Sequence, residues 1–306
     1  MRWPASDLDG ILLIDKAAGW TSHDVVAKTR GITGQRRIGH TGTLDPMATG
    51  LLVACLGKAT RLVEYMILHE KRYEGEITLG VTTDTDDAEG TVLNRRPVPP
   101  ITPDGLKALE RVFSGTLQQR PPAYSAVKVE GQRAYAAARR GNALELVPRE
   151  VTVHRLELER LAPDLLRIDV HCGSGTYVRS LARDIGEALG CGGHLSKLRR
   201  THAGGFTVAD AITLDDLSRL AAAGEMAEVI RQPDDGIIEF DAAIVSETTA
   251  ASIAAGVTTT PGPAVRPAEV ARIYEASGRF IAVGQVSSEG QIRPLKVFRE
   301  QNASVM

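Results

Sequence analysis

The stretch GHTGTLDPMATG, residues Gly39–Gly50, is the most distinctive part of this 306-residue chain. It places one acidic residue, Asp45, among three glycines, three threonines and one proline. Glycine permits tight turns, and Pro46 disfavours helical backbone at the residue before it. We therefore predict a stiff turn that presents the Asp45 carboxylate to a bulky substrate, as a nucleophile or a general base. Taken alone, a polar turn between two core elements is the better explanation, and the rest of the chain decides against it.

Length and composition indicate a globular protein with a sizeable core and room for two domains. The chain is 43% hydrophobic and 24% charged, which is ordinary for a soluble domain. Its three cysteines form no Cys-x-x-Cys pair, which argues against a disulfide framework or a cysteine-rich zinc site. We recognise no signal peptide and no apolar run of membrane-spanning length, so we expect a cytoplasmic protein without membrane contact.

Charge is unevenly distributed along the chain, although the net charge is only -2. Residues 111–140 carry six basic side chains against one acid, with Tyr124 and Tyr135 among them, whereas residues 237–306 carry six against seven. Arginines interleaved with aromatic side chains suit an RNA surface, because bases stack on rings while cations bind phosphates. A solvated amphipathic face explains the charge equally well, so charge alone leaves both interpretations open.

Hydrophobic periodicity and capping residues predict the main elements. Strands are expected at residues 10–14, 72–79 and 166–172, and in the second of these Tyr73 shares a face with Ile77 and Leu79. Helices are expected from Ser22 to Gly31, from Pro103 to just before Gly115, from Tyr177 to Leu189, and from Thr213 to about Ile230.

The order of these elements indicates an α+β (mixed α/β) fold with a mixed or antiparallel sheet, because strands and helices do not alternate strictly. Residues 231–236 resemble a linker, and the short strands expected at 280–286 and 292–297 are typical of a small β-barrel domain. We predict a catalytic domain over residues 1–232, with a basic insertion at 111–141, and a small β domain over residues 237–306.

Several standard chemistries fail on spacing. Gly57-Lys58 is not a phosphate loop, because the preceding glycine is too distant, and Gly173-Ser174-Gly175 lacks the first glycine of a nucleophile elbow. The Asp84–Gly90 stretch begins like a calcium loop but lacks its central glycine. The seven histidines include no His-x-x-x-His pair. We therefore expect a protein that uses neither a metal nor a cofactor.

At this point the chain resembles the bacterial TruB family, the tRNA pseudouridine-55 synthases. The resemblance runs through nearly all of residues 9–220 and depends on several blocks besides the Asp45 loop. These blocks are GILLIDK at 10–16, TSHDVV at 21–26, KRY at 71–73, TDTD at 83–86, PPAYSAVK at 121–128, GTYVRSL at 175–181 and HLSKLRRT at 194–201. Residues 237–306 resemble, more loosely, the family's C-terminal PUA-like RNA-binding domain.

The resemblance implies a role for each matched residue. Asp45 is the catalytic nucleophile or base, Tyr73 stacks on a uracil flipped out of the RNA, and Arg179 pairs with Asp45. Tyr177 and Leu198 line the base pocket, and His40 helps to hold the tRNA loop open. Lys16 from the first block, and Arg133, Arg139 and Arg140 from the basic insertion, are expected to contact the RNA.

The chemistry of these residue types agrees with those roles. A uridine must leave its stack before its glycosidic bond can be reached, at a cost of a few kcal/mol, and an aromatic platform returns roughly 1–3 kcal/mol. A guanidinium beside a buried carboxylate opposes its tendency to become neutral. The expected partner is the T stem-loop of tRNA, bound by a monomer without a protein partner.

Two alternatives stay open. A guide-RNA-dependent pseudouridine synthase would share Asp45, Tyr73 and Arg179, although the basic 111–140 segment favours a direct grip on tRNA. The chain could instead act as an RNA-binding tRNA folding factor, in which case Asp45 would be dispensable.

Overall fold

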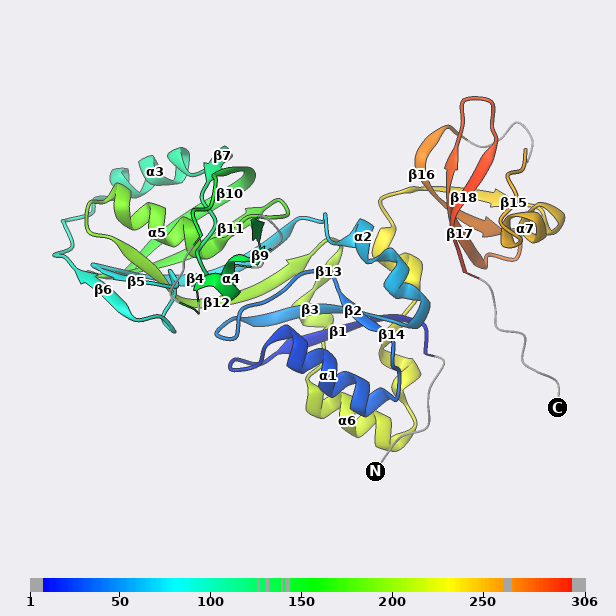
Figure 1. The fold of residues 1–306 in the computed structure, drawn as a ribbon, viewed down its shortest axis with the longest axis horizontal. Coiled ribbons are helices and arrows are strands. Elements are labelled where there is room, and N and C mark those ends of the chain that lie inside the picture. Colours follow the sequence, from blue (N-terminus) through cyan, green and yellow to red (C-terminus); the bar gives the residue numbers. More distant parts are fainter. Residues whose placement is uncertain are drawn as a thin grey trace.

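The computed structural model describes residues 8–125, 127–129, 132–138, 140, 144–260 and 266–298, with the side chains of 128, 129, 133 and 136 outside the description. Figure 1 shows a large part built on one twisted sheet and a small β part at the other end of the molecule. This arrangement confirms the α+β (mixed α/β) prediction, including the small C-terminal β domain.

The large sheet has ten strands, eight of which form a continuous path. In spatial order they are β14 (Ile230–Arg231), β1 (Gly10–Lys16), β3 (Thr49–Leu56), β12 (Gly193–Ala203), β4 (Lys71–Leu79), β11 (Leu165–Cys172), β10 (Arg149–Ala162) and β7 (Gly115–Gln119). Two short strands lie off this path, with β2 (Ile38–His40) beside β3 and β13 (Phe206–Thr207) beside β12.

One junction joins the two halves of this sheet. All other pairs along the path are antiparallel, whereas β3 and β12 pair in parallel through Thr49–Arg199 and Gly50–Arg200. Gly50 has φ +97°, and a Cβ there would lie 2.3 Å from the Arg200 carbonyl oxygen. Glycine is therefore required where the two halves meet.

Helices cover apolar faces of the large sheet. α1 (Ser22–Thr33) and α6 (Leu214–Ala223) lie together beside β1, whereas α5 (Val178–Ala188) packs on β12 and α3 (Pro103–Val112) packs on β10 (Figure 1). Their buried side chains join those of the central strands in one continuous core.

Smaller elements complete the large part of the chain. These are the turn η1 (Gly57–Leu62), α2 (Val63–Met66), the hairpin β5 (Val81–Thr83) and β6 (Val92–Arg95), the hairpin β8 (Lys128–Val129) and β9 (Gln132–Arg133), α4 (Ala134–Ala138), and the turns η2 (Val208–Asp210), η3 (Met226–Val229) and η4 (Pro233–Ile237).

The C-terminal part is a four-stranded sheet with its own core. Its order is β15 (Asp241–Val245), β16 (Ala268–Glu275), β17 (Phe280–Val286) and β18 (Ile292–Val297), and α7 (Glu247–Ala254) packs against it. It contacts the large part through Val283, which packs in a cluster with Ile11 and Met66, and through a Lys296–Glu64 ion pair of 2.7 Å.

Three predicted boundaries need correction. The first helix is capped by Thr21, in a reciprocal pair of hydrogen bonds with Asp24, and runs to Thr33. The helix from Thr213 ends at Gly224, whose left-handed backbone stops it, so that Ile230 lies in β14 instead. The expected linker is structured, because Arg231 pairs with Ile11 and Ile237 is fully buried.

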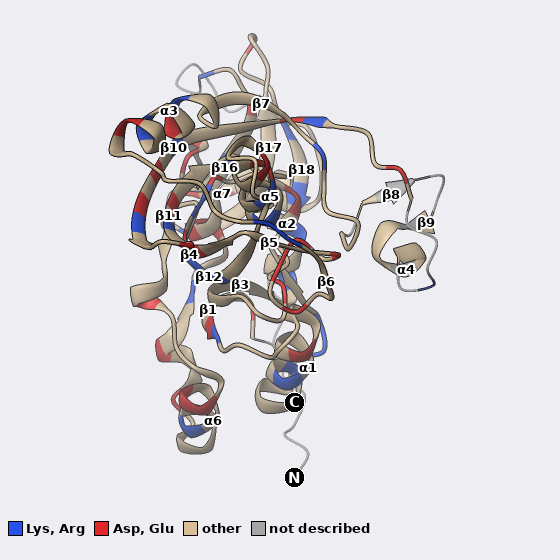
Figure 2. Cartoon of the chain, turned by 90° about the vertical axis from the view of Figure 1, so that its left-hand side faces the viewer, with Lys and Arg blue, Asp and Glu red and all other residues tan. Residues whose placement is uncertain are grey.

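The basic insertion divides into two kinds of structure. Its first third belongs to α3 and β7, whereas β8, β9 and α4 project to one side of the body in Figure 2. Of the arginines expected to contact RNA, Arg139 lies outside the described residues, as does the side chain of Arg133. In the part of the chain that the structure describes, no helix is long and apolar enough to cross a membrane.

Candidate active site

The Asp45 loop connects β2 to β3 and is held in place by hydrogen bonds to Ser22, Gly19 and Lys16. Ser22 Oγ accepts from the Leu44 amide (2.8 Å) and donates to the Leu44 carbonyl (3.1 Å). The Pro46 carbonyl accepts from the Gly19 amide (2.8 Å) and from Lys16 Nζ (3.2 Å). These contacts on both sides of Asp45 hold its backbone, as the sequence predicted for a stiff turn.

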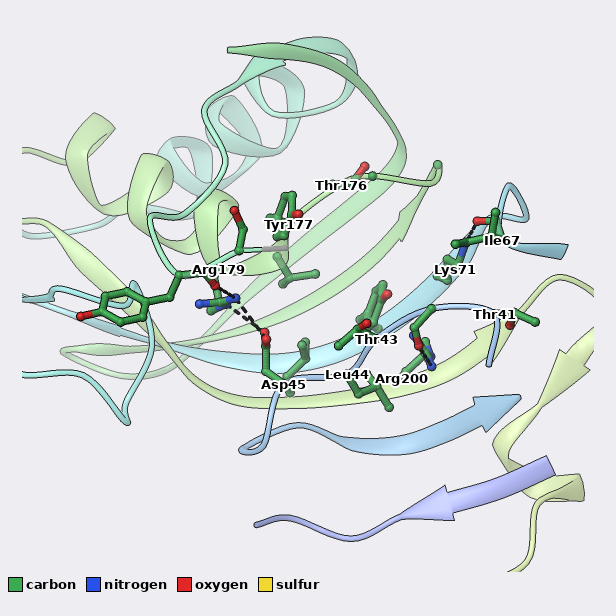
Figure 3. Close-up of a pocket in the computed structure, with 18 residues that line it drawn as sticks. Thr41, Thr43, Leu44, Asp45, Ile67, Lys71, Thr176, Tyr177, Arg179 and Arg200 are labelled. Atoms are coloured by element: carbon green, nitrogen blue, oxygen red, sulfur yellow. Dashed lines mark hydrogen bonds and ion pairs between the residues drawn. The ribbon is translucent and has the colours of Figure 1, made fainter. Parts of the chain in front are cut away.

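Asp45 forms a two-point ion pair with Arg179 from the first turn of α5 (Figure 3). Arg179 Nη2 donates to Asp45 Oδ1 at 3.1 Å, and Nε lies 2.9 Å from Oδ2. The Arg179 side chain is only 6% exposed, whereas that of Asp45 is 33% exposed. The arginine is therefore buried in the protein, and the carboxylate is the group of this pair that a substrate can reach.

Arg179 is itself fixed by three further groups. It donates to the carbonyls of Thr85 and Tyr124, each at 3.0 Å, and lies 3.4 Å from the carboxylate of Asp87. Two carboxylates thus share one guanidinium. This geometry sets the arginine's orientation before any substrate arrives.

Burial raises the pKa of Asp45 above its ordinary value, and the negative charge of Asp87 adds to this rise. The positive charge and hydrogen bond of Arg179 act in the opposite direction and favour the ionised carboxylate. The net shift of the Asp45 pKa is upward, because the poor solvation of the carboxylate outweighs the support that Arg179 gives to its charged form.

The pocket beside this pair has a volume of about 300 Å³. Tyr73 on β4 lies across from Arg200 on β12, and Leu198 is across from Gly75 in the same register. A Cβ at Gly75 would lie 2.6 Å from the Lys197 carbonyl oxygen, so glycine is needed for the strands to approach here. Tyr73, Leu198 and Tyr177 together give the pocket apolar walls of the kind that enclose a flat base.

The Tyr73 hydroxyl keeps its proton at neutral pH. Burial raises the pKa of Tyr73, and the positive charge of Arg200 only partly opposes this. The tyrosine is thus a neutral ring with a hydrogen-bonding hydroxyl.

The structure brings together five of the residues that the sequence nominated. Asp45, Tyr73, Arg179, Tyr177 and Leu198 all line this pocket, although they come from four separate segments. A second cavity, of about 620 Å³, lies on the other side of the Asp45–Arg179 pair and is lined in part by Tyr135 of the basic insertion.

Two other nominated residues, Lys16 and His40, are not among those that line the pocket. Lys16 is 1% exposed, and its Nζ donates to the carbonyls of Ala17, Trp20 and Pro46. Burial lowers the pKa of Lys16 to about 8, and Asp45 partly opposes this. His40 ends β2, where burial lowers its pKa and its ring meets His23 edge-on at 6.1 Å. Of the three nominated arginines, Arg140 is described and is exposed.

Sequence analysis missed Lys71, Arg200, Asp87 and Ser125 as site residues. The first three line the pocket or contact Arg179, and Ser125 Oγ is buried there without a hydrogen-bond partner. Each lies in or next to a block that carried the family resemblance, namely KRY, HLSKLRRT, TDTD and PPAYSAVK. Their position in or beside these blocks was the sequence signal that could have identified them as site residues. Among the described residues, no group of three or more His, Cys, Asp or Glu side chains could hold a metal ion.

Comparisons with known proteins agree with this geometry. Residues 30–178 match the family model described as TruB family pseudouridylate synthase (N terminal domain), and residues 179–239 match the tRNA pseudouridylate synthase B C-terminal domain. A tRNA pseudouridine synthase B from Thermobifida fusca (strain YX) is 53% identical over 230 residues, which is 72% of this chain and 78% of the relative. Another from Stutzerimonas stutzeri (strain A1501) is 42% identical over 298 residues, covering 96% of this chain and 97% of the relative.

Solved structures support the fold. A chain in the structure of an H/ACA RNP bound to a substrate RNA containing 2'-deoxyuridine superposes with a TM-score of 0.74 at 24% identity, covering 96% of this chain and 86% of that one. A chain of a Cbf5-Nop10-Gar1 complex gives 0.72 at 25% identity, covering 95% and 84%. The family resemblance predicted from the sequence is thereby confirmed, and this chain belongs to the TruB family of pseudouridylate synthases.

Proposed function

We propose that this enzyme isomerises uridine 55 in the T loop of tRNA to pseudouridine, acting alone and without a guide RNA. The observation that carries the proposal is the Asp45–Arg179 ion pair at the wall of a base-sized pocket that also contains Tyr73. The names of the two relatives support tRNA as the substrate.

The reaction begins with extrusion of the uridine from its loop. Unstacking costs a few kcal/mol, and stacking on Tyr73 returns roughly 1–3 kcal/mol. Tyr177 and Leu198 enclose the other sides of the base, while His40, at the edge of the Asp45 loop, supports the opened RNA. Because the unstacking cost and the stacking gain nearly balance, a small loss of stacking energy in the pocket would lower the fraction of RNA in which the uridine is flipped out.

Asp45 then acts on the ribose as an anion, either by attacking C1′ or by abstracting a ribose proton. The N1–C1′ bond breaks, the uracil rotates within the pocket, and a C5–C1′ bond forms. The proton on C5 is lost and N1 gains one, so the product has the composition of the substrate. Arg179 keeps Asp45 charged and oriented throughout, and Lys16 fixes the loop from beneath.

Direct binding of tRNA is supported by the projecting β8–β9 hairpin and α4 and by the basic residues of this segment, which are Arg133 in β9 and, after α4 in the sequence, Arg139 and Arg140. We assign the catalytic domain to residues 1–232 and a PUA-like RNA-binding domain to residues 237–306. We place the enzyme in the cytoplasm, which the three buried cysteines without a disulfide, Cys55, Cys172 and Cys191, suit, and we expect it to act as a monomer.

The test is to incubate the pure protein with an unmodified tRNA transcript, without any other RNA, and to map pseudouridine by position. Conversion at position 55, and none in a transcript carrying cytidine there, is the expected result. Conversion only after a guide RNA is added would overturn the standalone proposal. If Asp45→Asn retained full biological effect in cells lacking the enzyme, the protein would be a folding factor instead.

A further inference from the structure

The pocket contains two buried cations that the proposed chemistry does not use. Lys71 on β4 is 7% exposed and Arg200 on β12 is 1% exposed, and both line the pocket. Figure 3 shows them at the side of the pocket away from the Asp45–Arg179 pair. We call Lys71 and Arg200, with Thr41 and Gly42, the basic end of the pocket.

Neither cation has a carboxylate partner within the described residues. Lys71 Nζ donates to the carbonyls of Ile67 (2.7 Å) and His69 (2.5 Å), and Arg200 donates to those of Leu51 (2.6 Å) and Gly42 (3.1 Å). An ammonium has three N–H donors and a guanidinium has five, so both retain donors after these bonds. Buried cations are normally paired, because desolvation is costly.

A glycine lies next to both cations. A Cβ at Gly42 would lie 3.4 Å from Arg200 Nη1 and 3.9 Å from Lys71 Cε. Gly42 therefore lies beside both cationic side chains and places no side chain of its own between them. Burial, and after it the positive charge of Arg200, lower the pKa of Lys71 to about 8.

We propose that the basic end of the pocket binds a phosphodiester of the RNA that flanks the flipped uridine. The anion would complete the unused donors of both cations while the uracil reaches Asp45 at the other end. This identification of the phosphate rests on the proposed function, since that function places uracil beside Asp45. A phosphate contact of this kind positions the nucleotide and carries no base specificity.

The experiment measures binding of a T stem-loop RNA in an Asp45→Asn background, so that no turnover intervenes. Two RNAs carry a single neutral methylphosphonate, either 5′ or 3′ of the target uridine. We expect one of the two to bind roughly tenfold more weakly and to lower the slope of log affinity against log salt by roughly 0.7–0.9.

Lys71→Gln supplies the coupling test, with Lys107→Gln as the matched control, because Lys107 is an exposed lysine on α3. In Lys71→Gln, the methylphosphonate that weakened binding should cause little further loss of RNA affinity. In Lys107→Gln it should cause the same loss of affinity as in the protein with Lys107 intact. Lys71→Arg keeps the charge and should restore most of the affinity.

Equal losses at both linkages in every protein, or no loss at either, would overturn the proposal. The loss caused by methylphosphonate in the Asp45→Asn protein with Lys71 intact does not depend on whether Lys71→Gln folds. Conversion of uridine 55 is measured separately, so a protein that fails to convert it would refute the proposed function without affecting this binding result.

Discussion

At the scale of single residues, the site depends on how Asp45 is kept both reactive and charged. The carboxylate is partly buried, which raises its pKa, and Arg179 contacts both of its oxygens. Asp87, which is 4% exposed, shares the same guanidinium. Arg179 and Asp87 therefore act in opposite directions on the protonation of the Asp45 carboxylate, and each can be tested separately.

Asp45→Asn should abolish pseudouridine formation while leaving RNA binding intact. The amide keeps the shape of the carboxylate but can neither attack C1′ nor accept a proton, so the rate should fall on the order of 10⁴-fold or more. Binding should persist, since phosphate and stacking contacts dominate affinity. Single-turnover assays alongside filter binding would check both, and turnover within about tenfold of the parent would refute the assignment.

Tyr73 is predicted to contribute both its ring and its hydroxyl. Tyr73→Phe keeps the stacking surface, so its RNA affinity should barely change, whereas Tyr73→Ala should bind and react poorly. We expect the Phe variant to be slow in the chemical step as well, because the hydroxyl assists removal of the C5 proton. Single-turnover kinetics decide the matter, and a fully active Phe variant would leave only the stacking role.

The fall in single-turnover rate at acid pH should report the pKa of Asp45; we call this part of the pH–rate profile the acid limb. Activity requires the anion and is lost as the pH falls through this pKa, which burial raises above the ordinary aspartate value. Arg179→Gln removes the favourable charge and should move the limb to higher pH. Asp87→Asn removes a like charge and should move it to lower pH. Single-turnover rates across the acid range would check these opposite shifts, and shifts of the same sign would contradict this account.

At the scale of elements, the β3–β12 junction decides whether the two halves of the site meet. β3 follows the Asp45 loop and β12 carries Leu198 and Arg200. Their parallel pairing spans two residue pairs, and one of them includes Gly50. The loop and the pocket wall are therefore held in register by a short contact that tolerates no side chain.

Gly50→Ala should lower the free energy of unfolding by about 3 kcal/mol or more, because it adds a backbone clash to an unfavourable φ. The matched control is Gly224→Ala, at the end of α6, where φ is +80° but no heavy atom lies within 4 Å of the added Cβ. It should cost only about 1 kcal/mol. Denaturant unfolding of both variants measures the difference, and equal losses would show that the clash is relieved elsewhere.

At the scale of the whole molecule, the distribution of charge matters more than its sum. The chain has a net charge of -2, yet basic residues are concentrated in the 111–140 segment. The β8–β9 hairpin and α4 of that segment stand apart from the large sheet in Figure 2. Tyr124 and Tyr135 do not lie on its outer surface but line the cavities at the Asp45–Arg179 pair. The segment thus extends from its basic residues to the cavity beside the Asp45–Arg179 pair.

Replacing Arg133, Arg139 and Arg140 with glutamine should weaken tRNA binding and flatten its salt dependence. Each lost phosphate contact should reduce the slope of log affinity against log salt by roughly 0.7–0.9. The maximal rate at saturating tRNA should fall less than the affinity, since Asp45 is unchanged. Binding titrations at several salt concentrations measure the slope, and an unaltered slope would mean that these arginines do not contact the RNA.

Much of the fold and site could be predicted because the deciding signals are local. Alternation of apolar residues in Lys71–Leu79, the cap and proline at Thr102–Pro103, and the glycine-rich turn around Asp45 each follow from short stretches. The motif blocks then nominated Asp45, Tyr73 and Arg179. The end of α6 was mispredicted because the left-handed Gly224 outweighs the apolar residues that continue to Ile230.

The sequence by itself determined the family and the α+β class and nominated Asp45 as the reactive carboxylate, since these depend on residue types at fixed spacing. Only the tertiary structure decided which distant groups meet. Asp87 and Arg179 are far apart in the sequence but lie side by side in the structure. Arg200 and Lys71 likewise meet beside Gly42. Strand order and register bring both pairs together. Burial and unsatisfied charge are properties of that assembly, so the shifted pKa of Asp45 and the basic end of the pocket could not be found in any single segment.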